Sequence, residues 1–167
     1  MAVQLSERTS RQAGERLYAS LRGKVYPTFD APVEADEIIA YARSTRDDNP
    51  IRHEREAARA AGYADIVAPW PFLLALAAKR GQGVNALGDL GFTANHTLYG
   101  QQDFDCRRAA CAGEVLKGRQ RIVELVEKKK GTLLLLVLEI EWSDGAGETI
   151  AVSRQTLIVP LRGGAAA

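Results

Sequence analysis

Features that mark several common protein classes are scarce in this sequence. Only two cysteines occur, Cys106 and Cys111, and they form no CxxC pair, which argues against a disulfide framework or a cysteine-based zinc site. Apolar runs such as 133–138 are far too short to cross a bilayer, and the N-terminus is polar. We therefore expect a soluble, cytoplasmic protein with reduced thiols and no membrane partner.

A strong charge of either sign is also missing. The 22 basic and 21 acidic residues give a net charge of +1, so the composition gives no reason to expect a nucleic-acid partner. No group of His, Cys and acidic residues has metal-ligand spacing, and the chain has no glycine-rich phosphate loop. The sequence thus predicts neither a metal site nor a cofactor.

What the chain does have is the composition of one ordinary globular domain. Its 167 residues are 46% apolar and 26% charged, which is enough for a real core and a solvated surface. We expect residues 1–167 to form a single domain, with a helical N-terminal extension over 1–22 and a disordered tail over 163–167.

The apolar stretch from Ile66 to Gly81 is the most informative segment. No polar residue interrupts 72–78, and a helix that is apolar on all sides must be wrapped by other elements. Pro69 and Pro71 lie at or before the first turn, where prolines are tolerated, and Gly81 provides a stop. The stretch predicts a buried central helix, followed by a loop over 82–91.

The order of the other elements defines the fold class. Helices and a short edge strand are predicted before the apolar helix, over 6–21, 24–29 (the strand), 32–44 and 52–62. Four segments of strand character follow it, at 95–106, 115–128, 132–142 and 149–161. Helices first and antiparallel strands afterwards is an α+β order. A curved antiparallel sheet wrapped around one apolar helix is the hotdog fold, although other α+β rolls share this order.

The strand predicted at 132–142 has two different faces. One face carries Leu134, Leu136, Leu138, Ile140 and Trp142 and is expected to be core. The opposite face begins apolar but ends with glutamates at 139 and 141, so we expect that end to be open to water.

Three stretches resemble a known family. The segment from Tyr41 to Leu74, which contains TRDDNPIRH, the segment LYGQQDFDCRRAACAGEVLKG (98–118) and the segment GETIAVSRQTLIV (147–159) are similar to the MaoC-type (R)-specific enoyl-CoA hydratases and hydroxyacyl dehydratases. The resemblance is closer still to the N-terminal half of such enzymes, the FAS1-like dehydratase domain. It implies a hotdog fold, pairing of two hotdogs into a double hotdog, and an acyl-CoA or acyl-carrier-protein thioester as ligand.

The catalytic motif of that family is only partly matched. Active members read Asp-x-Asn-Pro-(Leu/Ile)-His, and the aspartate and histidine hold the water that adds across the double bond. The resemblance places Asp47 on the aspartate, Asn49 on the turn and Arg52 on the histidine. A guanidinium stays protonated and cannot relay a proton as an imidazole does. The adjacent His53, with Asp47 or Asp48, is the alternative acid–base pair.

A second departure lies at the entrance to the apolar helix. Active members carry Ala-His-Gly there, whereas this chain has Ala68, Pro69 and Trp70. Proline removes an N–H from the place where the thioester oxygen is held, and tryptophan fills space. With catalysis assigned to Asp47 and His53 if it occurs at all, the candidate substrate-binding residues are Asn49, Arg52, Pro69 and Trp70.

Each loop candidate also has a structural explanation. Asp47 suits a loop aspartate that caps the following turn, and Asn49 suits a turn former. His53 suits a surface histidine on a polar helix.

The resemblance and its departures lead to three hypotheses. The first is a non-catalytic, acyl-accommodating subunit of a heteromeric (R)-specific hydratase or dehydratase, in a heterodimer or heterotetramer with a catalytic MaoC-like chain. The second is a self-sufficient homodimeric hydratase that uses Asp47 or Asp48 with His53. The third is an acyl-CoA-binding hotdog with no enzymatic partner.

Overall fold

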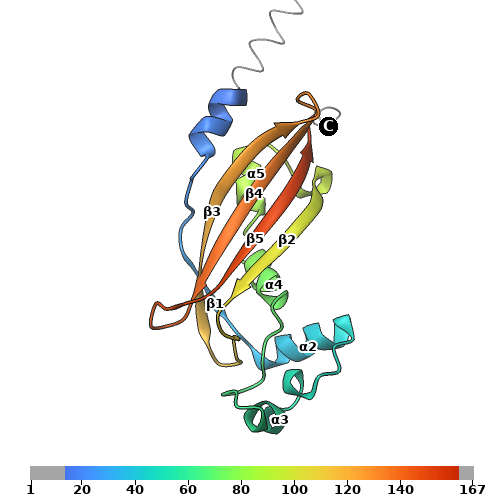
Figure 1. Ribbon diagram of the computed structural model, residues 1–167, viewed down its shortest axis with the longest axis vertical. Helices are drawn as coiled ribbons and strands as arrows, with labels where there is room; N and C mark the ends of the chain where they lie inside the picture. Colours follow the sequence, from blue (N-terminus) through green and yellow to red (C-terminus); the bar gives the residue numbers. More distant parts are fainter. Residues whose placement is uncertain (1–13, 162–167) are drawn as a thin grey trace, which may run out of the picture.

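Five strands form one antiparallel sheet in the order β1-β3-β4-β5-β2 in the computed structural model, which describes residues 14–161 (Figure 1). The strands are Phe29–Pro32 (β1), Leu98–Cys106 (β2), Val115–Lys128 (β3), Leu133–Ser143 (β4) and Thr149–Pro160 (β5). Every neighbouring pair is antiparallel. The predicted extension over 1–22 falls partly outside the described residues, and the predicted tail over 163–167 falls wholly outside them.

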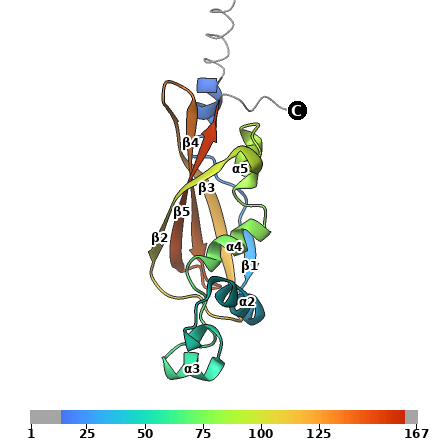
Figure 2. The ribbon, with the colours of Figure 1, turned by 90° about the vertical axis from the view of Figure 1, so that its right-hand side faces the viewer.

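Most of the helices lie on one side of this sheet and beyond its lower end, whereas the helix over 14–21 lies at its upper end (Figure 2). They are Ala35–Thr45 (α2), the 3₁₀ turn Pro50–Arg52 (η1), Arg55–Ala60 (α3), Phe72–Lys79 (α4), Val84–Asp89 (α5) and the 3₁₀ turn Ala94–His96 (η2), together with a helix over 14–21. The long curved sheet wraps α4 and α5, which is the hotdog fold predicted from the element order.

The core follows the alternation of the strands. The inner face of β4 consists of the five predicted residues, and all are buried: Leu134, Leu136, Leu138, Ile140 and Trp142. The Trp142 indole N–H donates to Ser153 Oγ at 3.0 Å, which satisfies its one polar group in the interior. Its ring also meets Phe29 edge-on, with centroids 5.6 Å apart.

The central helix is shorter than the apolar stretch suggested. Helix α4 spans only Phe72–Lys79, and Ile66–Ala68 runs extended beside residues 110–112. One side of the helix is not wrapped, since Leu74 is only partly buried and Ala78 is exposed. The fully enclosed helix was therefore a wrong expectation for the single chain, because the sheet covers one face of α4 and leaves the other open.

The segment predicted as a loop over 82–91 contains a second helix, α5. Ala86 and Leu87 of this helix are buried under the upper half of the sheet. The buried side chain of Gln120 fixes its start by accepting from the Gly83 N–H at 2.8 Å and donating to Asn85 Oδ1 at 2.9 Å. A buried amide is stable only when its groups are paired, so Gln120 determines where α5 begins.

The predicted strand over 24–29 is also displaced along the chain. The strand β1 is Phe29–Pro32. The segment before it is tied to β3 by an isolated bridge from Val25 to Arg121 and by main-chain hydrogen bonds of Gly23 and Lys24 with Ile122 and of Tyr26 with Gln120. Pro32 therefore ends a strand instead of starting a helix. Within residues 14–161, no helix is long and apolar enough to span a membrane.

Candidate functional site

The loop that resembles the hydratase motif follows α2 directly. Arg46 ends that helix in the left-handed region, at φ 57°. The Asp47 carboxylate then accepts from the Asn49 N–H at 3.1 Å, and the Asn49 side-chain oxygen accepts from the Ile51 N–H at 3.3 Å. These two consecutive side-chain turns lead into the 3₁₀ turn Pro50–Arg52. Asp47 and Asn49 therefore shape the loop, as their structural explanation predicted.

Arg52 connects this loop to the entrance of α4. Its Nη1 donates to the Val67 carbonyl at 2.9 Å, and its Nε lies 3.5 Å from Asp47 Oδ2. The Nε atom is buried and has no hydrogen-bond partner within the described residues. The Val67 N–H in turn donates to the Ile51 carbonyl at 3.0 Å, so loop and entrance are tied twice. At the position that resembles the catalytic histidine, this chain holds a side chain that fastens the backbone.

His53 is close to Asp47 but does not contact its carboxylate. The His53 Nε2 lies 2.6 Å from the Asp47 main-chain oxygen. A carbonyl oxygen can only accept, so Nε2 carries the proton in this contact. The Nε2–H of His53 is thus engaged by the Asp47 main-chain oxygen. The Asp47 carboxylate accepts from the Asn49 N–H and lies beside Arg52. Asp48 is exposed to solvent.

The entrance to α4 offers few free amide groups. Pro69 is buried and Trp70 is half-buried. The Ala68 N–H donates to the Ala110 carbonyl at 2.9 Å, and the Phe72 N–H donates to the Pro69 carbonyl at 2.9 Å. Proline at 69 and at 71 supplies no N–H at all. Among residues 68–72, this leaves the Trp70 amide as the one donor without a main-chain partner.

Asp47, Asn49, Arg52 and His53 therefore lie in one loop, which Arg52 connects to Val67, two residues before Pro69 at the helix entrance. Their arrangement provides shape and fixed positive charge but not an acid–base pair. Within residues 14–161, no three His, Cys, Asp or Glu side chains are grouped so as to hold a metal ion.

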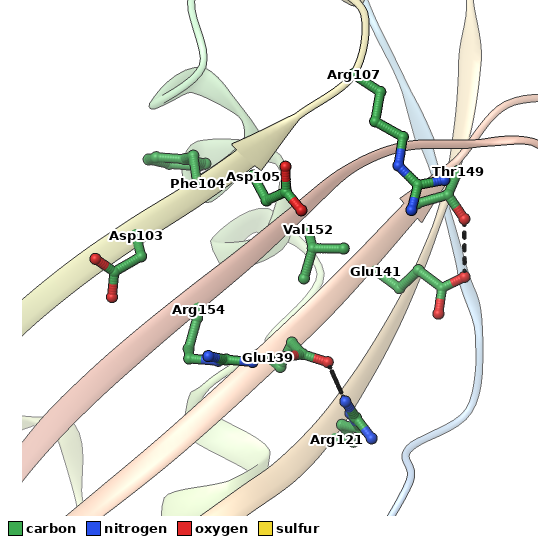
Figure 3. Close-up of a pocket in the computed structure, with 10 residues that line it drawn as sticks. All are labelled: Asp103, Phe104, Asp105, Arg107, Arg121, Glu139, Glu141, Thr149, Val152 and Arg154. Carbon is green, nitrogen blue, oxygen red and sulfur yellow. Dashed lines mark hydrogen bonds and ion pairs between the residues drawn. The ribbon is translucent and has the colours of Figure 1, made fainter.

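A separate pocket of about 520 Å³ lies on the outer face of the sheet, which is the face turned away from α4 and α5 (Figure 3). Its lining alternates in charge across four strands. Arg121 of β3, Glu139 of β4, Arg154 of β5 and Asp103 of β2 are successive Cα partners. This row was not predicted, because it arises from strand register and not from spacing along the chain.

Glu139 corrects the expectation of a wet end on β4. The residue is only 7% exposed, because Arg121 Nε donates to its Oε1 at 2.8 Å and Arg154 Nη2 to its Oε2 at 2.6 Å. Burial alone raises the pKa of this carboxyl, but the hydrogen bonds from Arg154 and Arg121 outweigh burial, and the pKa is lowered. Two arginines from neighbouring strands cover it.

The fold and the loop together indicate a class of protein. The chain is a hotdog domain whose Asp-x-Asn-Pro turn is tied to the entrance of its central helix, as in MaoC-like dehydratase domains. The family model of the FAS1-like dehydratase domain region matches residues 20–153, and the chain belongs to that family. The resemblance stated from the sequence motifs is thereby confirmed.

Relatives of similar length support this assignment. A UPF0336 protein of Parafrankia sp. is 32% identical over 139 residues, covering 81% of this chain and 89% of that protein. A UPF0336 protein of Clavibacter michiganensis is 30% identical over 141 residues, covering 83% and 93%.

Solved structures show the same fold. The HadBC (3R-hydroxyacyl-ACP dehydratase) complex of Mycobacterium tuberculosis contains a chain that is 26% identical, with a TM-score of 0.71 over 83% of this chain and 96% of that chain. The ChsH1-ChsH2 complex of the same organism gives a TM-score of 0.68 at 21% identity, over 93% and 98%. At that identity, the second likeness concerns the fold alone.

Proposed function

We propose that this chain is the non-catalytic, acyl-accommodating subunit of a heteromeric (R)-specific enoyl-thioester hydratase or 3-hydroxyacyl-thioester dehydratase. The observation that carries the proposal is the engagement of Arg52, which stands where the family has its histidine and whose guanidinium binds the Val67 carbonyl. Hydration needs one group that takes a proton from water and one that protonates the α-carbon. A guanidinium does neither.

The surroundings of Arg52 support the same conclusion. The neighbouring His53 has its Nε2–H on the Asp47 carbonyl, and Pro69 removes an amide from the entrance of α4. A developing enolate oxygen is stabilised by aligned N–H donors, which this entrance largely lacks. In this proposal, the half-buried Trp70 presents apolar surface to an acyl chain.

Partnering is supported by the relatives and by an open edge of the sheet. The HadBC structure, which contains a chain 26% identical to this one, is a complex. In our proposal, a MaoC-like partner carrying the complete Asp-x-Asn-Pro-x-His motif pairs its sheet with β2 and supplies the acid–base residues. The ligand is the acyl part of an acyl-CoA or acyl-carrier-protein thioester, and this chain lines its cavity.

The test is reconstitution with a catalytic partner. The chain alone, a MaoC-type chain with the complete motif, and their co-expressed mixture are assayed for hydration of crotonyl-CoA and of longer 2-enoyl-CoAs. We expect no turnover by this chain alone and turnover, or a shift toward longer substrates, in the mixture. An Asp→Asn change in the partner's motif should abolish turnover, whereas Asp47→Asn in this chain should retain most of it.

Two outcomes lead to the other hypotheses. Turnover by the purified chain alone, lost in His53→Ala, would establish a self-sufficient homodimer that uses Asp47 or Asp48 with His53. Binding of acyl-CoA without turnover alongside any MaoC-like partner would establish a binding protein. A matched control for His53→Ala is Glu54→Ala, which alters the exposed neighbour.

A further inference from the structure

The edge strand β2 is open along its length. It pairs with β5 on one side, and no other described strand lies on its other side. The irregularity between Tyr99 and Gln101 leaves a regular six-residue stretch, Gln101–Cys106, that is available for pairing. Nine residues of edge without proline or lysine form a template for another strand.

The outer face of this open edge is acidic. Asp103 and Asp105 lie on it, and both are exposed. Asp103 accepts from Gln101 Nε2 at 3.0 and 2.9 Å, which is a neutral donor. Arg154 stands directly opposite Asp103 on β5, but its guanidinium is held by Glu139 (Figure 3). Neither aspartate makes an ion pair within residues 14–161.

Two copies of this chain could pair five of the six residues in the stretch 101–106 in only two ways. A two-fold axis normal to a continuous sheet makes outer-face residues face outer-face residues, so the axis then passes at Asp103 or at Phe104. In the first register, Asp103 faces its own copy. In the second, Asp103 faces Asp105 of the other copy, twice. Directly opposite side chains lie ~5 Å apart at Cβ, and like charges there are destabilising.

We propose that the acidic outer row of β2, Asp103 and Asp105, selects against self-pairing and in favour of a different hotdog chain that carries lysine or arginine at the facing positions of its own edge strand. This proposal rests on the proposed function, in that it takes the partner to be a second hotdog subunit. It adds the chemistry of the strand that fits and the reason why the homodimer is disfavoured. The row acts on the choice of partner and not on catalysis.

The experiment uses this chain as its own partner. The probe is the double variant Asp103→Lys/Asp105→Lys, mixed one to one with the unmodified chain at low salt and followed by sedimentation equilibrium. Opposite charges then face each other in either register. We expect the mixture to associate about tenfold or more tightly than either protein with itself, and the gain to disappear at high salt.

Two further variants make the result specific. The neutral double variant Asp103→Asn/Asp105→Asn should associate with itself about tenfold more tightly than the unmodified chain, because only repulsion is removed. The double variant Asp30→Lys/Glu124→Lys has the same change in net charge at exposed residues away from β2. It should give no gain on mixing. Thermal melts of each variant confirm that it is folded.

The proposal is overturned if the unmodified chain associates with itself as tightly as the asparagine variant does, or if the mixture with the lysine variant shows no gain. Neither readout involves turnover. If the catalytic assignment proved wrong, these association results would be unchanged. If the association experiment failed, reconstituted activity would still support the proposed function, but the acidic row would no longer explain the choice of partner.

Discussion

The two edges of the sheet are built in opposite ways. On one side, β1 is four residues long and ends at Pro32, and the segment before it covers the rest of β3 through Val25 and Tyr26. On the other side, β2 is nine residues long and has no covering segment among the described residues. Proteins normally protect long edges because such edges recruit other strands. One edge is therefore closed by the chain itself, and the other is open among the described residues.

The closed edge depends on a close approach that only glycine permits. Gly118 of β3 faces Phe29 of β1, and a Cβ at 118 would lie 2.2 Å from Phe29 Cζ. We expect Gly118→Ala to lower the free energy of unfolding by about 3 kcal/mol, the largest effect in this set. Urea denaturation measures it.

The open edge offers the matched control. At Gly100, in the irregular part of β2, an added Cβ would meet Ile158 Cδ1 at 3.1 Å, the end of a side chain that can move, and the Thr156 carbonyl oxygen at 3.2 Å. Gly100→Ala should cost only about 1 kcal/mol. The double variant Gly118→Ala/Phe29→Leu should recover part of the loss. Equal costs at the two glycines would contradict the difference between the edges.

Glu139 holds together the strands that lead to the two edges. It accepts hydrogen bonds from Arg121 on the β1 side and from Arg154 on the β2 side. Because its pKa is lowered on folding, its contribution is complete above the pKa of the unfolded chain and is lost as the pH falls through the lower pKa of the folded state. We expect Glu139→Gln to lower the free energy of unfolding by about 2 kcal/mol at pH 7. Urea titrations should show this difference shrinking below about pH 4.

A carboxylate on α5 fastens the segment that covers β3. Asp89 accepts from Lys24 Nζ at 2.7 Å and from the Tyr26 hydroxyl at 2.5 Å, and the hydrogen bonds from these two groups lower its pKa. Asp89→Asn should reduce the free energy of unfolding by about 1 kcal/mol. Hydrogen exchange should show faster opening of residues 24–26, with β2 unchanged as the internal control.

The smallest effect concerns a thiol at the end of the open edge. Burial raises the pKa of Cys106, and the charge of Asp105 raises it further. Asp105→Asn should therefore speed alkylation by iodoacetamide at pH 8 by a few-fold, since more thiolate is present. Bound partner should slow the reaction again. An unchanged rate in Asp105→Asn would mean that burial alone controls the thiol.

Regular strands were predictable because their signal is local and repeated. The predicted strand 115–128 coincides with β3 from end to end, since its buried residues alternate. Helix α5 was missed because a short helix between glycines has too few residues to show a period, and its start is set by Gln120, far away in sequence. The burial of Glu139 was missed for a similar reason, because the two arginines that cover it come from other strands.

In the candidate site, too, local contacts were predictable from the sequence and long-range contacts were not. The turn at Asp47 and Asn49 was predicted because side-chain turns depend on neighbouring residues. The bond from Arg52 to the Val67 carbonyl joins residues fifteen positions apart, and nothing in the spacing announces it. The sequence indicated which residue had replaced the imidazole but not the task that the replacement performs.

That contact also bears on how such a subunit can change over time. An Arg52→His reversion restores the imidazole but withdraws the donor that serves the Val67 carbonyl, and Pro69 would still withhold an amide from the neighbouring helix entrance. Under the proposed function, we expect each single step back toward an active site to begin with a loss of stability and to bring no turnover. Under that proposal, once a partner supplies the acid–base residues, the loss of activity in this chain is difficult to reverse.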